Sequence, residues 1–142
     1  MENVVELRGL ELLDELQFSL MSRQELTEML EEEIEIEQVE IDLYWVLRLL
    51  EDRDIDLEQI MIDAQAADIY GFYDTETKET YVIAEDEELS VMEEVFLAHE
   101  ITHALQDQHF DLSLLASEDT DYDRILAFLS MVEGDAVLTQ EL

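Results

Sequence analysis

Two histidines and a glutamate stand at the spacing of a metal hydrolase site in the segment His99-Glu100-Ile101-Thr102-His103. Residues four apart in a helix lie one above the other on one face, so both imidazoles can reach one metal ion. Glu100 then lies beside that ion, where a glutamate of this motif serves as general base. The segment therefore predicts a zinc hydrolase site with His99 and His103 as metal ligands and Glu100 as the catalytic base.

The residues around this motif indicate the helix that the site requires. Ser90 and Glu93 have the spacing of a capping box, which favours a helix start at this point. Apolar positions then recur at helical rather than strand spacing. These positions are Val91, Val95, Leu97, Ala98, Ile101, Thr102 and Leu105. The motif is thus expected in the middle of a helix, where its two histidines share a face.

A third protein ligand must come from elsewhere, because catalytic zinc usually takes three and leaves a fourth position open. His109 is one candidate, since it follows His103 at the metzincin spacing. Gln106 stands where that pattern has a glycine to turn the chain back toward the metal. If the helix continues instead, His109 lies roughly 80° around the axis from His99 and off the ligand face. Glu133 is the second and preferred candidate, on what is expected to be another helix.

The segments AHEITHALQDQHFDL and VEGDA resemble the gluzincin metallopeptidases, whose third ligand is a glutamate on a helix downstream of the HExxH motif. The resemblance implies a zincin-like fold, one Zn²⁺, His99, His103 and Glu133 as its ligands, and Glu100 as the base. It covers about residues 90–140, and the segment GFYDTETKETYVI before it is similar to the hairpin at the cleft edge of those enzymes. Twenty-nine residues separate His103 from Glu133, an interval longer than in thermolysin-like members.

A β-hairpin is predicted just before the motif helix, from Phe72-Tyr73 and Tyr81-Val82-Ile83 around a polar turn. In gluzincins an edge strand binds extended substrate by adding it to the sheet, a known mode of peptide binding. Gly71, Phe72 and Tyr73 are therefore candidates for a substrate-binding edge. The alternative is a hairpin with a structural role only.

Further polar residues are expected around the ligands. A ligating imidazole normally donates its other N–H to a carboxylate or a carbonyl, and Asp107 and Asp135 are candidates for this role. A group that stabilises the oxyanion is not evident from the sequence, and Tyr122, Arg124 and His109 are three options for it.

The rest of the chain predicts an α+β fold, mainly helical, with a small sheet next to the HExxH helix. Extended segments are expected at 3–7 and 16–21, and helices after Ser22, over 33–50 and over 56–68. Aromatic residues and Met131 at helical spacings are expected in the core, among them Tyr44, Trp45, Phe96 and Phe128. The interpretation is one zincin-like domain over 1–142, with a helical part at 1–60 and the hairpin and metal-site helices at 70–142.

Composition excludes several partners. The formal net charge is −34, with 40 acidic against 6 basic residues. Nucleic-acid binding depends on Lys and Arg, and anionic membranes repel such a chain, so neither partner is expected. A peptide or protein substrate, with basic peptides favoured by charge, is expected instead. The chain has no cysteine, no apolar run that spans a bilayer and no signal-peptide pattern, which predicts a soluble protein whose location and oligomeric state stay open.

The sequence as a whole favours a zinc-dependent metallopeptidase that cleaves peptide bonds with activated water and Glu100 as base. The chain stops soon after Glu133, whereas larger gluzincins wall their pocket with a C-terminal subdomain, so a latent or truncated enzyme also fits. The alternative from another class is a non-catalytic structural module. A closed zinc shell that includes both His109 and Glu133 would be its signature.

Overall fold

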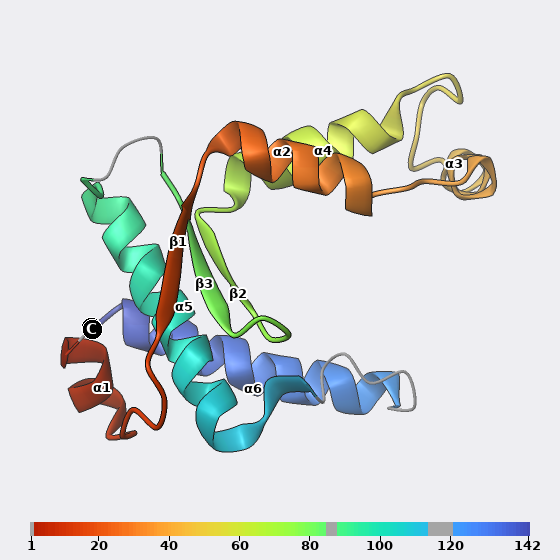
Figure 1. Ribbon diagram of the computed structural model, residues 1–142. Helices are drawn as coiled ribbons and strands as arrows, with labels where there is room; N and C mark the ends of the chain where they lie inside the picture. The colour runs from red at the N-terminus through yellow and green to blue at the C-terminus, as the bar shows by residue number, and fades with distance from the viewer. Residues whose placement is uncertain (1, 85–87, 114–120) are drawn as a thin grey trace. The chain divides into compact units, whose positions relative to one another are not determined.

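A computed structural model of the chain describes residues 2–84, 88–113 and 121–142 (Figure 1). These residues form an α+β fold in which helices predominate over one small sheet, as predicted. Within these ranges, no helix combines the length and the apolar composition needed to cross a membrane. The chain groups into two compact units, residues 1–21 with 70–142 and residues 22–69. The expectation of one domain over 1–142 stays a prediction.

The first unit contains the sheet and the helices that carry the HExxH motif and Glu133. Its helices α5 and α6 pack against each other, and α5 also packs against β2 and β3. The predicted hairpin is confirmed as β2 and β3. In chain order, the elements of this unit are α1 (Glu2–Arg8), β1 (Gln17–Met21), β2 (Gly71–Asp74), β3 (Glu79–Ile83), α5 (Val91–Phe110) and α6 (Tyr122–Gln140).

Strand β2 lies at an edge of the three-stranded sheet, whose order is β1-β3-β2. It runs antiparallel to β3, whereas β1 runs parallel to β3 on the other side. The Ile83 N–H donates to the Tyr70 carbonyl, so Tyr70 and every second residue after it turn their backbone groups toward β3. The backbone groups of Gly71 and Tyr73 therefore point to the open side of β2.

The helix α1 corrects the extended segment expected at 3–7. Val4 is buried and packs with Ile101 and Leu105 of α5 in one hydrophobic cluster. Valines favour strands by intrinsic preference, but contact with an apolar helix face overrides that preference here. Part of the apolar side of α5 that the sequence predicted, Ile101 and Leu105, is thus packed against α1.

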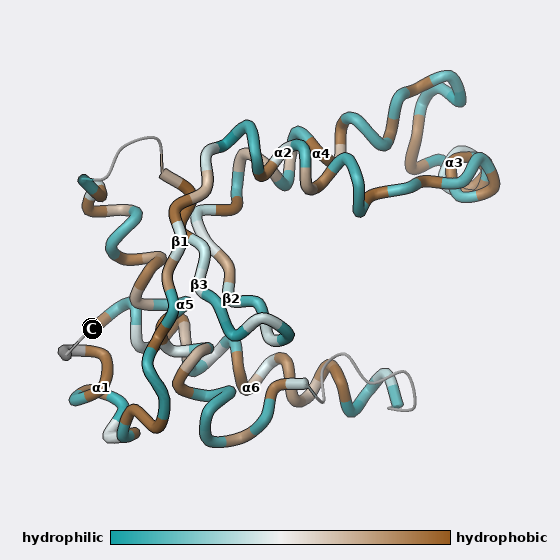
Figure 2. The backbone as a smooth tube through the Cα atoms, viewed as in Figure 1, coloured by the Kyte–Doolittle hydropathy of each residue, from teal (hydrophilic) through white to brown (hydrophobic). Residues whose placement is uncertain are grey.

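The second unit is built on α2 (Arg23–Glu33) and α4 (Leu57–Asp68), which pack together through buried leucine and isoleucine side chains. Hydrophobic and hydrophilic positions alternate along both helices in Figure 2. Ser22 caps α2 with a capping box, as predicted. The helix expected over 33–50 is wrong in part, because α2 ends at Glu33 and α3 spans only Gln38–Val46. Ile34 is extended, and Glu37 opens α3 with its own capping box.

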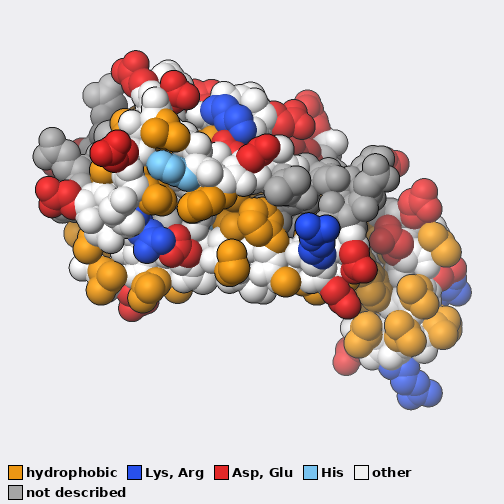
Figure 3. All heavy atoms as spheres, turned by 90° about the horizontal axis from the view of Figure 1, so that it is seen from below, with side chains coloured by type: hydrophobic (Ala, Val, Ile, Leu, Met, Phe, Trp, Pro, Cys, Tyr) orange, Lys and Arg blue, Asp and Glu red, His pale blue; other side chains and the backbone are white. Residues whose placement is uncertain are grey.

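Helix α3 has no buried residue, and its apolar side chains gather at the right of Figure 3. Tyr44 and Trp45, expected in the core, are exposed by 38% and 42%. Trp45 instead stacks with the guanidinium of Arg53, 5.0 Å from its ring centroid. Met131 of α6 is also exposed, so the core expectation is wrong for these three residues. Spacing alone does not show which side of a helix meets another element.

Candidate metal centre

The HExxH motif lies in the middle of α5, a helix of 20 residues that starts as the sequence predicts. The Ser90 side chain accepts the N–H of Glu93, and the Glu93 carboxylate accepts the N–H of Ser90 at 2.5 Å. His99 and His103 follow two and three turns later, and their ring centroids lie 4.6 Å apart. The helix therefore presents both imidazoles on one face.

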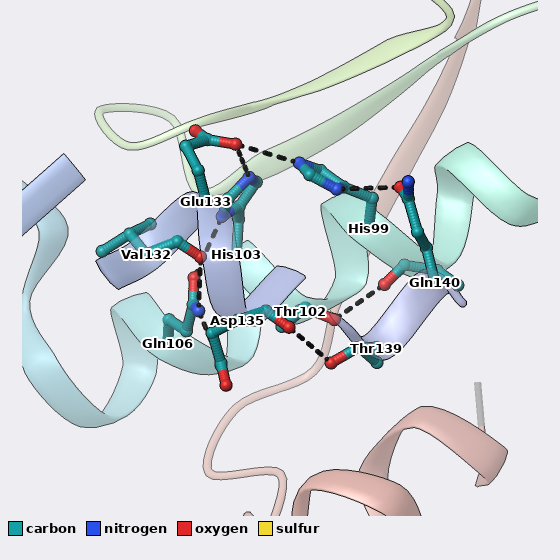
Figure 4. Close-up of polar contacts among 10 residues, drawn as sticks. His99, Thr102, His103, Gln106, Val132, Glu133, Asp135, Thr139 and Gln140 are labelled. Carbon is teal, nitrogen blue, oxygen red and sulfur yellow. Dashed lines mark hydrogen bonds and ion pairs between the residues drawn. The ribbon is translucent and has the colours of Figure 1, made fainter. Parts of the chain in front are cut away.

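Glu133 reaches the two imidazoles from α6, as Figure 4 shows. Its Oε2 lies 3.2 Å from Nε2 of His99 and 3.6 Å from Nε2 of His103. One ligand atom from each of the three residues lies within 4.8 Å of the other two, an arrangement that could hold a metal ion. It is the one such group in the part of the chain that the structure describes.

His109, the alternative third ligand, does not join this group. Helix α5 continues to Phe110, so His109 keeps the helical rotation that turns it away from His99 and His103. Its Nε2 lies 2.8 Å from the backbone carbonyl of Glu11, to which it can donate a hydrogen bond. The residue thus ties the end of α5 to the segment that follows α1.

Gln106 fixes the tautomer of His103, that is, which of its two ring nitrogens carries the proton. Its amide nitrogen donates to the Val132 carbonyl at 3.0 Å and to the Asp135 carboxylate at 2.8 Å. The amide oxygen must therefore face Nδ1 of His103, 3.0 Å away, and it accepts the proton from that nitrogen. With the proton on Nδ1, Nε2 has a free lone pair directed at Glu133, which is the form that binds a metal.

Gln140 plays the same part for His99. Its Oε1 lies 3.0 Å from Nδ1 of His99, again leaving Nε2 on the side of Glu133 (Figure 4). Two glutamine oxygens thus orient the two imidazoles, in place of the carboxylates of Asp107 and Asp135 that the sequence suggested. This corrects the expected partners, because a neutral amide satisfies the N–H without burying another charge.

Asp135 and Asp107 form no direct hydrogen bond with either histidine among the described contacts. Asp135 accepts from Gln106 and forms an ion pair with Arg8, so it supports His103 only through the glutamine. The buried carboxylate of Asp107 accepts from the Tyr73 hydroxyl and from Lys78, both at 2.7 Å. It therefore joins α5 to the β2–β3 hairpin.

Glu100 is buried, with a relative exposure of 7%. Burial, and then the negative charge of Glu133, raise the pKa of Glu100 to about 7. The backbone N–H of Tyr73 acts in the opposite direction and favours the carboxylate. A pKa near neutrality suits a group that must both take up and give back a proton.

Burial also affects His103. It lowers the pKa of His103 below the ordinary value, although the hydrogen bond to Gln106 and the charge of Glu133 raise it. The imidazole is therefore held in its neutral state, which metal binding requires. Desolvation thus shifts the pKa values of Glu100 and His103 in opposite directions and favours the neutral form of both groups.

The predicted substrate edge lies against the base. A Cβ added to Gly71 would stand 3.3 Å from Cγ of Glu100 and 2.8 Å from the carbonyl oxygen of Tyr81. The absence of a Cβ at Gly71 therefore permits the close approach to the Tyr81 carbonyl and leaves room for the Glu100 side chain against β2. Phe72 lies between Gly71 and Tyr73, and its ring stacks on that of Tyr81 across the hairpin.

The three oxyanion options find no support in the geometry. Tyr122 starts α6, eleven residues before Glu133 and thus about 16 Å away along the helix axis. Arg124 lies only two residues closer, and His109 is held at Glu11. Sequence reasoning missed Gln106 and Gln140 as partners of the histidines. The i, i+3 spacing of His103 and Gln106 was a usable signal, whereas only the tertiary fold brings Gln140 to His99.

No family model, curated protein or solved structure matches this chain. The resemblance to gluzincins thus depends on the motif residues alone and stays a prediction.

Proposed function

We propose that this protein is a zinc-dependent metallopeptidase in which Glu100 is the general base. The observation that carries the proposal is the convergence of Nε2 of His99, Nε2 of His103 and Oε2 of Glu133 beside a buried glutamate. Two imidazoles and one carboxylate are a donor set that Zn²⁺ prefers in hydrolases. The residues therefore fit the metal that the motif implies.

A Zn²⁺ ion held by these three residues would polarise the scissile carbonyl and lower the pKa of a water molecule. Glu100 takes the proton of the attacking water on its carboxylate and passes it to the leaving nitrogen. The peptide runs along the open side of β2, where the backbone groups of Gly71 and the carbonyl of Tyr73 can pair with an extended chain while the Tyr73 N–H faces Glu100.

The non-catalytic alternative required His109 as a fourth ligand in a closed shell. In the residues that the structure describes, the group has three members, and His109 is bound to Glu11 instead. Three protein ligands leave a coordination position for a reactant, which favours a catalytic site over a structural one.

The test is Glu100→Gln in the zinc-supplemented protein, assayed against a mixed peptide library. We expect zinc content to stay the same and hydrolysis to fall by at least about 100-fold, because glutamine cannot accept the proton. Glu94→Gln, with the same loss of charge in the first turn of α5, is the matched control and should keep its activity. Zinc-loaded protein that cleaves no peptide, or equal rates in both variants, would contradict the proposal.

A further inference from the structure

Asp107 carries an unusual set of partners for a residue outside the metal centre. Its side chain is only 3% exposed, in a chain of charge −34 where burying one more carboxylate is costly. Three donors compensate this cost: the Tyr73 hydroxyl, the Lys78 ammonium and the backbone N–H of Leu112. Lys78 is the only lysine in the chain.

Two of these three donors belong to the hairpin, whereas Leu112 follows the end of α5. Tyr73 lies in β2 and Lys78 directly before β3. Asp107 therefore attaches both ends of the hairpin turn to the helix that carries the HExxH motif. Burial and the hydrogen bond to Asp107 raise the pKa of Tyr73, so its hydroxyl keeps its proton and remains a donor.

Tyr73 contacts the same helix at a second point. Its hydroxyl donates a hydrogen bond to Asp107, while its backbone N–H donates to the carboxylate of Glu100. These two acids are seven residues apart, which is about two turns or 10 Å along α5. The hydrogen bonds of Asp107 with Tyr73 and Lys78, here called the anchor, thus set the position of β2 along α5. The position of Glu100 relative to β2 depends on the same anchor.

We propose that Asp107 is a positioning residue for the base: by holding Tyr73 and Lys78 it fixes β2 at the height on α5 where Glu100 meets the Tyr73 N–H. The inference deepens the proposed peptidase and depends on it. It assigns Asp107, Tyr73 and Lys78 to the placement of the base, and not to the metal. Asp107 has no hydrogen bond to His99, His103 or Glu133 among the described contacts.

The experiment measures zinc affinity, KM and kcat for Tyr73→Phe and Lys78→Met. We expect zinc affinity and KM within about twofold of wild type and a kcat reduced by about 10- to 100-fold, since a small misplacement of a reacting group costs this much. Lys78→Arg keeps the charge and should recover most of the rate. Tyr81→Phe is the matched control, because its hydroxyl lies on Glu79 of the same hairpin and not on α5.

An unchanged kcat in Tyr73→Phe would overturn the inference, as would a parallel loss of zinc affinity and rate, which would assign the anchor to the metal centre as a whole. Crystal structures separate this failure from failure of the proposed function. If the wild type cleaves no peptide, the proposed peptidase activity is wrong. The role of Asp107 is then tested by the position of the Glu100 carboxylate in the crystal structures. A carboxylate that moves away from β2 in Tyr73→Phe supports the anchor, whereas an unmoved one refutes it.

Discussion

Nε2 of His99 and Oε2 of Glu133 lie 3.2 Å apart, although 34 residues separate them in the chain. The contact exists because α6 passes α5 with its later residues beside the earlier residues of α5. Gln140 meets His99, while Val132 and Asp135 meet Gln106. The same crossing thus brings the third carboxylate and Gln140 to the histidines, and it gives Gln106 of α5 its hydrogen-bond partners on α6.

The first prediction concerns the third ligand. We expect the purified protein to bind one zinc ion, and Glu133→Ala to weaken this binding by orders of magnitude, because one of three donors is lost. His109→Ala should bind zinc as wild type does, since its ring lies on the Glu11 carbonyl. Titration against a competing chelator measures both affinities. Weak binding by His109→Ala with intact binding by Glu133→Ala would favour the metzincin-like arrangement.

A second prediction concerns the orientation of His103. Gln106→Leu removes the acceptor of the Nδ1 proton of His103. We expect zinc affinity to fall by about 10- to 100-fold, because losing the hydrogen-bond partner of a ligating imidazole usually has an effect of this size. Gln108→Leu is the matched control. Gln108 bonds the backbone of Leu13 and Asp14 and contacts neither histidine. Equal affinities in the two variants would show that Gln106 does not orient the ligand.

The site was partly predictable because its central motif is local. Two histidines four residues apart need only a helix to meet, and the capping box at Ser90 signals where that helix starts. Glu133 came from a resemblance, and its distance from the histidines could not be derived from spacing. Gln140 and the anchor at Asp107 depend on which helix faces cross, information that no local pattern contains.

The fold shows the same division. Turn residues, caps and apolar periodicity predict the hairpin, α4 and α5. The same local signals do not predict α1. Val4 and Val5 suit a strand on their own, and only packing against Ile101 and Leu105 explains the helix. The break between α2 and α3 was visible as the alternation Ile34, Ile36, but the many glutamates favoured a continuous helix.

The third prediction is a pH dependence of stability that comes from Asp107. Burial alone would raise its pKa, but hydrogen bonds from Lys78, Tyr73 and the Leu112 N–H outweigh burial and lower the pKa below its ordinary value of 3.8. The unfolded chain therefore binds the proton first as pH falls. The stabilisation is complete above pH of about 4 and is lost as pH falls through the folded-state pKa.

Urea unfolding of the zinc-free protein between pH 7 and pH 3 measures this effect. We expect Asp107→Asn to be less stable than wild type at pH 7, with a difference that narrows below pH of about 4. Lys78→Met should reduce the same pH dependence, since Lys78 contributes most to lowering the pKa. A difference between wild type and Asp107→Asn that stays constant over this range would contradict the assignment.

The last prediction compares two glycines that differ in their surroundings. At Gly71 an added Cβ would lie 2.8 Å from the Tyr81 carbonyl oxygen and 3.3 Å from Cγ of Glu100. The carbonyl belongs to the paired strand and cannot move without disturbing the hairpin, so Gly71→Ala should lower the free energy of unfolding by about 1–3 kcal/mol. It should also slow peptide hydrolysis, because the methyl group pushes Glu100 away from β2.

Gly134→Ala is the matched change and should have the opposite sign. Gly134 lies inside α6, and an added Cβ there meets no atom within 4 Å. Alanine removes backbone freedom from the unfolded chain, so we expect a gain of about 0.5–1 kcal/mol. Denaturant unfolding of both zinc-free variants beside wild type gives the two values. If Gly71→Ala proved as stable as Gly134→Ala, Gly71 would not lie against the Tyr81 carbonyl as closely as the structure places it.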